Sequence, residues 1–191
     1  SDGTVVKCIN FDGIKEVGDA VAMGRRYSAE GADELVFLDI TATFEGRRTF
    51  AELVEKIALN INIPFTVGGG ISTLEDASRL LDAGADKVSI NSSAIATPDL
   101  IDKIASKYGS QFVVVAIDAR SEGSRWLCTT HGGRKATDKE LFAWAKEAEQ
   151  RGAGEILFTS MDHDGTKQGY ACPQYRQLNA LLGIPVIASG G

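Results

Sequence analysis

An internal repeat is the feature that most constrains the fold of this 191-residue chain. Residues 63–70 (IPFTVGGG) recur in similar form as residues 184–191 (IPVIASGG). Residues 31–38 (GADELVFL) recur as residues 152–159 (GAGEILFT), so that both pairs have the same offset of 121 residues. Two similar pairs at one fixed offset indicate a chain that is built from two similar halves.

Short apolar runs alternate with helical patterns along the whole chain, which is typical of an α/β fold with a parallel sheet. The apolar runs predict strands at about residues 34–40, 64–67, 87–90, 112–117, 155–159 and 185–189. The intervening patterns predict helices at about residues 19–30, 50–60, 73–83, 98–108, 138–151 and 173–182. Asp19, Thr73 and Asp138 are the expected helix N-caps. Residues 8–18, 41–48 and 160–169 are predicted as loops, and residues 126–133 as a small hairpin.

The repeat also predicts how many strands the complete fold contains. Moving the strand near residue 115 back by 121 positions places it just before residue 1, and moving the strand near residue 89 forward places it near residue 210, beyond the sequence. We therefore expect four strands in each half. Eight parallel βα units form a TIM (β/α)8 barrel. The expectation is a single barrel domain over residues 1–191, made of two duplicated half-barrels and truncated at both ends. A doubly wound sheet is the alternative.

Composition excludes several classes of function. The net charge of −6 and the acidic pI near 5.0 argue against a nucleic-acid binder or a membrane-surface protein, and there is no apolar run of membrane-spanning length. The cysteines (Cys8, Cys128 and Cys172) lack the spacing of a metal motif, and the chain has only two histidines. We expect reduced thiols, a cytoplasmic protein, and neither a metal nor a cofactor.

Polar residues gather where the predicted strands end, which is where TIM barrels carry their active sites. They are Asp39, Thr41, residues 68–70, residues 91–93, Asp118, residues 159–164 and residues 189–191. Two glycine turns occupy equivalent positions in the two halves. Bare backbone N–H groups after a strand suit a phosphate, so the pattern predicts a substrate with a phosphate at each end. Each turn alone would indicate only a tight turn.

Asp118 is the strongest catalytic candidate. It follows six apolar residues, 112–117, so we expect it at the mouth of a dry barrel, where its pKa can rise toward general acid–base use. The alternative is a buried aspartate that caps the next loop. Lys7 could bind an anionic group or be an ordinary surface lysine. Residues 162–164 (DHD) lack a third spaced metal ligand, which favours a loop that orders substrate hydroxyls.

A second pattern marks the opposite ends of the strands. The pair Gly-Ala recurs at residues 31, 84 and 152, and in each case the fourth residue starts a predicted strand. These fourth residues are Glu34, Lys87 and Glu155, which should ring the amino-terminal mouth of the barrel. Their mixed charges favour a salt-bridged plug over unpaired solvent-facing charges, because pairing offsets the cost of placing charges there.

Five segments together resemble the cyclase subunit of imidazole glycerol phosphate synthase, and the resemblance spans the whole chain. They are residues 38–42 (LDITA), 67–71 (VGGGI), 87–91 (KVSIN), 113–119 (VVVAIDA) and 162–169 (DHDGTKQG). The resemblance implies a TIM barrel of histidine biosynthesis that forms a heterodimer with a glutaminase subunit. It implies a lyase that takes ammonia from that partner. Its bisphosphorylated substrate, phosphoribulosyl-formimino-AICAR ribonucleotide, becomes imidazole glycerol phosphate and AICAR.

The same resemblance implies roles for individual residues. Asp118 would be the general acid, one of two essential aspartates. The substrate-binding residues would be Lys7, Asp39, Gly70, Asn91, Ser92, Thr159, Asp164, Gly165 and Gly191. Within this set, Gly70, Asn91 and Ser92 would hold one phosphate, and Gly165 and Gly191 part of the other. Glu34, Lys87 and Glu155 would be three of four residues that gate the ammonia passage. Asp86 would face the glutaminase, and Ala171 replaces an expected aspartate.

Two other functions fit parts of the pattern. The sister isomerase of the same pathway is also a duplicated barrel with paired aspartates and phosphates, but it needs no ammonia passage and therefore no charged ring. The loop at residues 162–167 (DHDGTK) also favours the cyclase. A non-catalytic barrel that only binds phosphosugars is the alternative from a different class.

Overall fold

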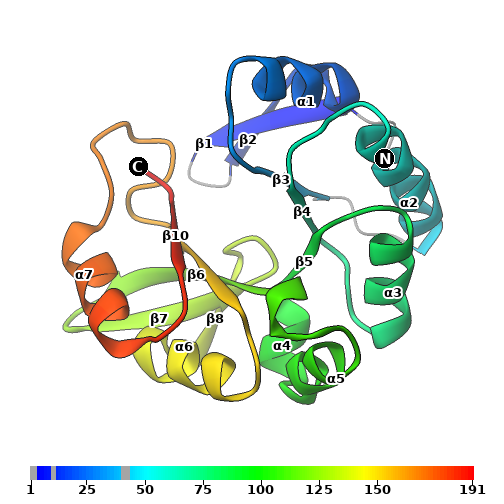
Figure 1. Cartoon of the computed structure of the whole chain (residues 1–191). Coiled ribbons are helices and arrows are strands. Elements are labelled where there is room, and N and C mark those ends of the chain that lie inside the picture. Colours follow the sequence, from blue (N-terminus) through cyan, green and yellow to red (C-terminus); the bar gives the residue numbers. More distant parts are fainter. Residues whose placement is uncertain (1–3, 10–11, 40–43) are drawn as a thin grey trace. The chain divides into compact units, whose positions relative to one another are not determined.

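The computed structural model describes residues 4–9, 12–39 and 44–191. The chain forms two compact units. The first consists of Ser1–Lys7 with Ile14–Ser89, and the second of Cys8–Gly13 with Ile90–Gly191. Figure 1 labels the helices and strands of both units.

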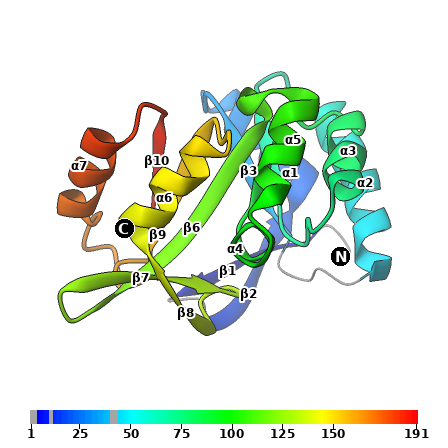
Figure 2. The same ribbon diagram turned by 90° about the horizontal axis from the view of Figure 1, so that it is seen from below.

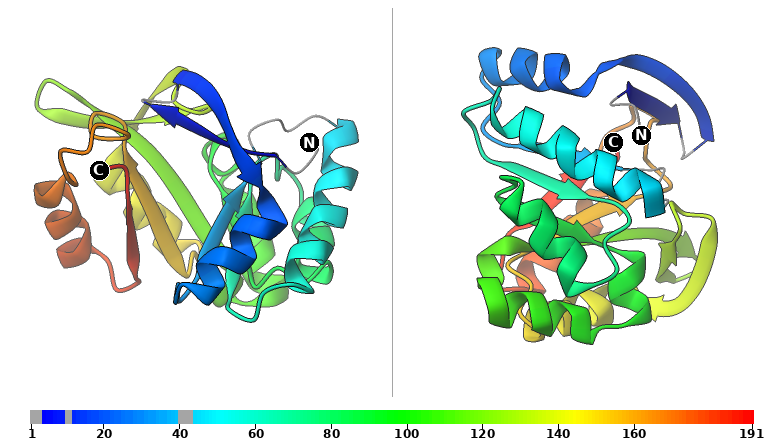
Figure 3. Two further views of the ribbon diagram at one scale, coloured as in Figure 1. Left: turned by 90° about the horizontal axis from the view of Figure 1, so that it is seen from above. Right: turned by 90° about the vertical axis from the view of Figure 1, so that its right-hand side faces the viewer.

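The described part of the chain opens with a two-stranded sheet of β1 (Thr4–Ile9) and β2 (Asp12–Asp19). The predicted loop over residues 8–18 is therefore wrong for most of its length. Its glycines indicated a loop, but pairing between the two strands satisfies the backbone groups that a loop would leave to water. Figure 3 shows β2 leading directly into α1 (Ala20–Ala29). As predicted, Asp19 caps this helix, and its carboxylate accepts a 2.8 Å hydrogen bond from the Ala22 N–H.

Three parallel strands follow in the first unit. β3 (Leu35–Leu38) pairs with β4 (Phe65–Gly68), and β4 pairs with β5 (Lys87–Ile90). The register sets Leu38 opposite Gly68 and Gly68 opposite Ser89. The carboxyl ends of the three strands therefore meet at one edge of this sheet, as the alternating pattern predicted.

Two helices cover these strands on the same side (Figure 1): α2 (Phe44–Ala58) and α3 (Leu74–Asp82). The predicted loop over residues 41–48 is wrong from Phe44 onward, because the charged residues there are good helix formers despite Gly46. Thr73 caps α3 in a capping box with Asp76, as expected. The apolar side chains between helices and strands are fully buried: Val54, Ile57, Val67, Ala77 and Val88.

The second unit continues the alternation. Its helices are α4 (Ser92–Ala96), α5 (Asp99–Tyr108), the 3-10 turn η1 (Ser110–Phe112), α6 (Leu141–Gln150) and α7 (Cys172–Leu181). Its strands are β6 (Val113–Glu122), β7 (Arg125–Thr130), β8 (Lys135–Glu140), β9 (Glu155–Ser160) and β10 (Val186–Ser189). β6 and β10 both pair with β9 in parallel. The buried core includes Ile117, Trp144, Ile156, Phe158 and Leu178.

The predicted hairpin after β6 is present but larger than expected. β6 runs past Asp118 because β7 pairs antiparallel with its second half, and β8 then pairs with β7 (Figure 2). The expected N-cap Asp138 lies inside β8. Since β8 pairs with β7 as far as Glu140, α6 begins only after that residue. The Glu140 carboxylate accepts the N–H groups of Phe142 and Ala143, each at 3.0 Å, and so takes over the capping role.

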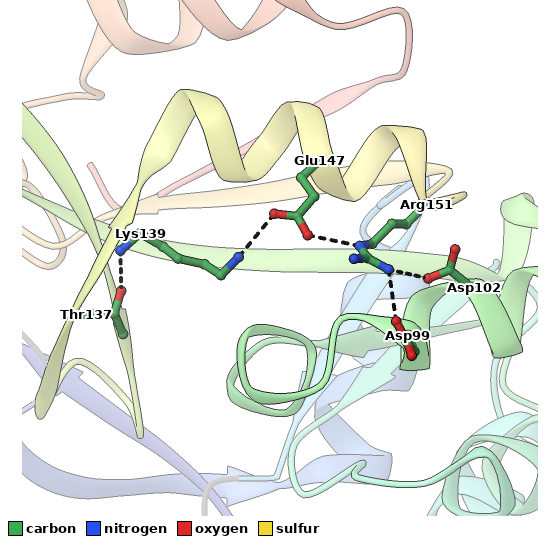
Figure 4. Close-up of polar contacts among 6 residues, drawn as sticks. All are labelled: Asp99, Asp102, Thr137, Lys139, Glu147 and Arg151. Carbon is green, nitrogen blue, oxygen red and sulfur yellow. Dashed lines mark hydrogen bonds and ion pairs between the residues drawn. The ribbon is translucent and has the colours of Figure 1, made fainter.

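An ion-pair network joins α5, α6 and β8 on the surface of the second unit (Figure 4). The Arg151 guanidinium contacts Asp102 at 2.8 Å, Asp99 at 3.1 Å and Glu147 at 3.0 Å. Glu147 also pairs with Lys139 at 3.1 Å. Although burial raises the pKa of Glu147, the hydrogen bonds and charges of Lys139 and Arg151 outweigh it and lower that pKa overall.

Candidate functional site

The glycine turn after β4 is required by a close approach of two backbone segments. Gly69 has φ of +96°, and a Cβ atom there would overlap the backbone oxygen of Asp39. The Asp39 N–H in turn donates a 2.8 Å hydrogen bond to the Gly68 carbonyl. Only glycine tolerates both the positive φ and this contact. The turn thus brings the end of β3 against the end of β4.

Two predicted substrate-binding residues, Asp39 and Gly70, line one small pocket in the first unit. The other residues that line it are Phe50, Gly69, Ile71, Asp76, Arg79 and Leu80. The Asp76 carboxylate is already occupied, because one of its oxygens accepts hydrogen bonds from the N–H groups of Ser72 and Thr73. The pocket is therefore lined by the positive side chain of Arg79, by glycine backbone and by Asp39. Thr41, which the sequence placed at this edge, lies outside the described residues.

Asp118 lies in the second unit, where neighbouring strands hold it from both sides. In register it stands opposite Thr159 on β9 and Thr129 on β7. The side chain is 9% exposed. Burial raises the pKa of the Asp118 carboxyl to about 6, hydrogen bonds from Thr159 and Asn91 oppose the rise, and the charge of Asp164 adds to it. A carboxyl with this pKa is present in both protonation states near neutral pH.

The loop after β9 meets the end of β10 within the same unit. A Cβ on Gly190 would come within 2.9 Å of the Ser160 carbonyl oxygen and 3.3 Å of the Asp164 Cβ, so the two segments are in close contact. Burial raises the pKa of Asp164. Gly165 and Gly190 both have positive φ, +72° and +76°. Gly191 packs near Tyr170. The roles of Gly165 and Gly191 in binding a phosphate stay predictions.

Asn91 and Ser92 follow β5 and contact two different elements. The Asn91 Nδ2 donates a 2.9 Å hydrogen bond to Oδ2 of Asp118. The Ser92 Oγ accepts a 2.9 Å hydrogen bond from the backbone N–H of His131, in the turn between β7 and β8. The structure thus gives Asn91 a partner that sequence reasoning had not anticipated, and the phosphate role of both residues stays a prediction.

The polar loop after β9 is held by its own acidic and imidazole side chains. Asp162 Oδ2 accepts a 2.9 Å hydrogen bond from the backbone N–H of Ser121 on β6, and the His163 Nδ1 lies 2.8 Å from the Ser160 Oγ. Sequence reasoning missed the Asp162 contact, because it depends on the unforeseen extension of β6. Within the described residues, no group of three or more His, Cys, Asp or Glu side chains could hold a metal ion.

Two of the three predicted gate residues form an ion pair in the first unit. The Lys87 ammonium lies 3.0 Å from Oε1 and 3.1 Å from Oε2 of Glu34. The Thr66 hydroxyl donates a further 3.0 Å hydrogen bond to Glu34 Oε1. All three side chains lie at the amino-terminal ends of β3, β4 and β5 or just before them. Glu155 starts β9 in the second unit, in register with Val114 of β6.

Asp86, Ala171 and Lys7 lie in three different elements or next to them. Asp86 is exposed, and its Oδ2 accepts a 2.9 Å hydrogen bond from the Phe65 N–H. Ala171 is buried just before α7. Lys7 lies in β1, where the structure describes the backbone only.

The Cys128 thiol is not a candidate nucleophile. It is fully buried in β7 opposite Ala119 of β6, and burial raises its pKa to about 12. A thiol, unlike a thiolate, is a poor nucleophile at neutral pH. Among the described residues, no helix combines the length and the apolar character that a membrane crossing requires.

Comparison with known proteins identifies the family of this chain. The family model described as "Histidine biosynthesis protein" matches residues 1–191. Relatives named imidazole glycerol phosphate synthase subunit HisF are 63% identical in Bacteroides fragilis and 64% in Phocaeicola vulgatus, each over 190 residues. A relative of the same name in Bacteroides thetaiotaomicron is 63% identical. Each match covers 100% of this chain and 76% of the relative. The chain therefore belongs to the family of histidine biosynthesis proteins.

Proposed function

We propose that this protein is the cyclase subunit of imidazole glycerol phosphate synthase, a lyase of histidine biosynthesis. It converts phosphoribulosyl-formimino-AICAR ribonucleotide and ammonia to imidazole glycerol phosphate and AICAR. The observation that carries the proposal is Asp118, a buried carboxyl whose pKa is raised to about 6 at the meeting point of β6, β7 and β9. It is supported by the identity of about 63% to relatives named as HisF subunits.

Asp118 suits the proton transfers that this reaction needs. Release of AICAR breaks a carbon–nitrogen bond, and the departing nitrogen leaves more readily when it receives a proton. A carboxyl with a pKa near 6 holds a proton in a substantial fraction of molecules at neutral pH and is still acidic enough to give it up. We therefore assign Asp118 the role of general acid.

The residues proposed to bind the substrate are grouped within each unit. Asp39 and Gly70 share the pocket of the first unit, and Lys7 would contribute a positive charge. Thr159, Asp164, Gly165 and Gly191 belong to the segments that meet after β9 and β10, and Asn91 and Ser92 follow β5. Backbone N–H groups at glycine turns bind phosphate oxygens well, which supports a substrate with two phosphate groups.

A glutaminase is the proposed source of the ammonia. The names of the relatives describe them as subunits of a synthase, and a cyclase that uses free ammonia needs a supply of it. We assign Glu34, Lys87 and Glu155 to the gate of an ammonia passage and Asp86 to the face that meets the partner. The ion pair between Glu34 and Lys87 supports a gate, since it can open and close by breaking and reforming.

The sister isomerase is the competing function. It belongs to the same type of duplicated barrel, but it consumes no ammonia. In an isomerase the Glu34–Lys87 ion pair would therefore contribute only to stability. The similar proteins in the three Bacteroides and Phocaeicola species carry the name of the HisF subunit rather than that of an isomerase. Both observations favour the cyclase.

The test is ammonium-driven turnover of phosphoribulosyl-formimino-AICAR ribonucleotide by the purified protein. We expect AICAR release, and we expect Asp118→Asn to lower kcat by about 100-fold or more, because the general acid is lost. Asp138→Asn, an exposed aspartate on β8, is the matched control and should keep normal turnover. Normal turnover by the Asp118→Asn variant would overturn the assignment. Turnover of the isomerase substrate in place of the cyclase substrate would establish the competing function.

A further inference from the structure

Asn91 stands where a helix N-cap is expected, yet it does not act as one. Asparagine is among the preferred N-cap residues because its side chain can accept a backbone N–H of the first turn. Asn91 precedes α4 and makes no such side-chain hydrogen bond. Its amide reaches β6 instead and donates to the Asp118 carboxylate at 2.9 Å. The Asn91 side chain therefore binds the Asp118 carboxylate and does not cap α4.

The orientation of the amide depends on Asp118. The Asn91 Oδ1 is buried and accepts no hydrogen bond from any residue in the described part of the chain. A buried acceptor without a donor is unfavourable. The observed orientation is retained because it gives the carboxylate a charge-assisted hydrogen bond, which is roughly twice as strong as a neutral one. Turning the amide over would place two acceptors against each other.

We propose that Asn91 is a positioning residue for Asp118, whose amide fixes the orientation of the carboxyl group and favours its ionised form. The role in catalysis rests on the proposed cyclase function. In each catalytic cycle the general acid gives up its proton, and the site must then stabilise the resulting carboxylate. Asn91 stabilises that carboxylate without touching the reacting atoms itself.

The other groups around Asp118 within the second unit differ in their effect on the pKa of its carboxyl group. From β9, the Thr159 hydroxyl donates to the carboxyl and lowers its pKa, and from the loop after β9 the Asp164 carboxylate raises it. From β7, Cys128 is a neutral thiol with a pKa of about 12. The Thr129 hydroxyl contacts the backbone oxygen of Asp118 at 3.2 Å and the Met161 Sδ at 3.0 Å, and neither contact involves the Asp118 carboxylate. Asn91 and Thr159 are thus the two side-chain donors that lower this pKa, and removing either should raise it.

A phosphate-binding role for Asn91 predicts a different outcome. A residue that only holds a substrate phosphate contributes to ground-state binding, and its loss raises KM without moving the pH dependence of kcat. A residue that only stabilises the fold changes the melting temperature and leaves both unchanged. The pKa of Asp118 therefore separates the positioning role from the other two roles, and KM and the melting temperature separate those two from each other.

The experiment compares the protein with its Asn91→Leu variant, which keeps a similar volume but has no donor. The pKa of Asp118 is read from the pH titration of its 13C-labelled carboxyl carbon by NMR. We expect the pKa of Asp118 to rise by about one unit. The alkaline limb of the pH profile of kcat should then move to higher pH by the same amount. Asn91→Ala repeats the measurement if the leucine variant does not fold. Asn179→Leu, at an exposed position of α7, is the matched control.

An unchanged Asp118 titration in a folded Asn91 variant would overturn the proposal, whatever happens to KM. The titration does not depend on the identity of the substrate. Absence of cyclase turnover in the unmodified protein would therefore refute the proposed function, while the titration would still decide whether Asn91 sets the state of Asp118.

Discussion

Replacing Asp118 by asparagine should make the folded protein more stable at neutral pH while it removes the general acid. The pKa of this carboxyl is about 6 in the folded state and 3.8 in the unfolded reference. The folded state therefore binds the proton more tightly than the unfolded state does. Stability is highest below pH 4 for this group and is lost as the pH rises through the interval between the two values.

The size of the effect follows from the shift. A difference of about two pKa units corresponds to about 3 kcal/mol once the pH exceeds both values. Asparagine has nearly the same shape and no titration, and the Asn91 amide can still donate to its side-chain oxygen. We therefore expect the free energy of unfolding of Asp118→Asn, relative to the unmodified protein, to increase by about 2.5 kcal/mol between pH 4 and pH 7, since the unfolded carboxyl is already more than half ionised at pH 4.

Urea denaturation at a series of pH values measures this difference. The two proteins share all other titrating groups, so the pH dependence of the difference isolates Asp118. Asp138→Asn is again the control, because its position on β8 is exposed. A difference between Asp118→Asn and the unmodified protein that stays constant from pH 4 to pH 7 would refute the reasoning, since it would mean that burial does not perturb this carboxyl.

Two further predictions concern charged pairs elsewhere in the chain. Lys87→Glu places a second negative charge beside Glu34, so glutamine-driven turnover in the complex with the glutaminase should fall more than ammonium-driven turnover does; equal losses in the two assays would argue against a gate. Glu147→Gln breaks the contacts with Lys139 and Arg151 and should lower the free energy of unfolding by about 0.5–1 kcal/mol at pH 7. Because the pKa of Glu147 is lowered in the folded state, this loss should disappear as the pH falls through that pKa, and thermal unfolding at pH 7 and pH 3 checks it.

Local signals were sufficient to predict most of the fold. Asp19 and Thr73 precede helical patterns and cap the helices that the structure shows. The strand over residues 87–90 was predicted at its observed bounds, because its apolar run is flanked by a glycine turn and a polar segment. The TIM-barrel fold class, which the repeat of 121 residues predicted, is that of the family to which the chain belongs.

Most of the errors arose where distant pairing overrode local preference. Asp138 is a better N-cap than Glu140 by its residue type, but the pairing of β8 with β7 moves the start of the helix. The glycines at residues 13 and 18 indicated a loop, whereas β2 pairs with β1. The hydrogen bond between Asn91 and Asp118 joins positions 27 residues apart. Such a bond depends on side-chain orientation, which no local pattern encodes.

The burial of Cys128 turns this residue into a natural reporter of motion in the hairpin. A thiol-specific reagent needs both access and a thiolate, and the closed structure offers neither at this position. The exposed Cys172 should be modified rapidly in the native protein. The rate at which Cys128 is modified would then report how often β7 detaches from β6. Comparing this rate with the rate of global unfolding would give the local stability of β7, the strand that pairs with β6 at Asp118.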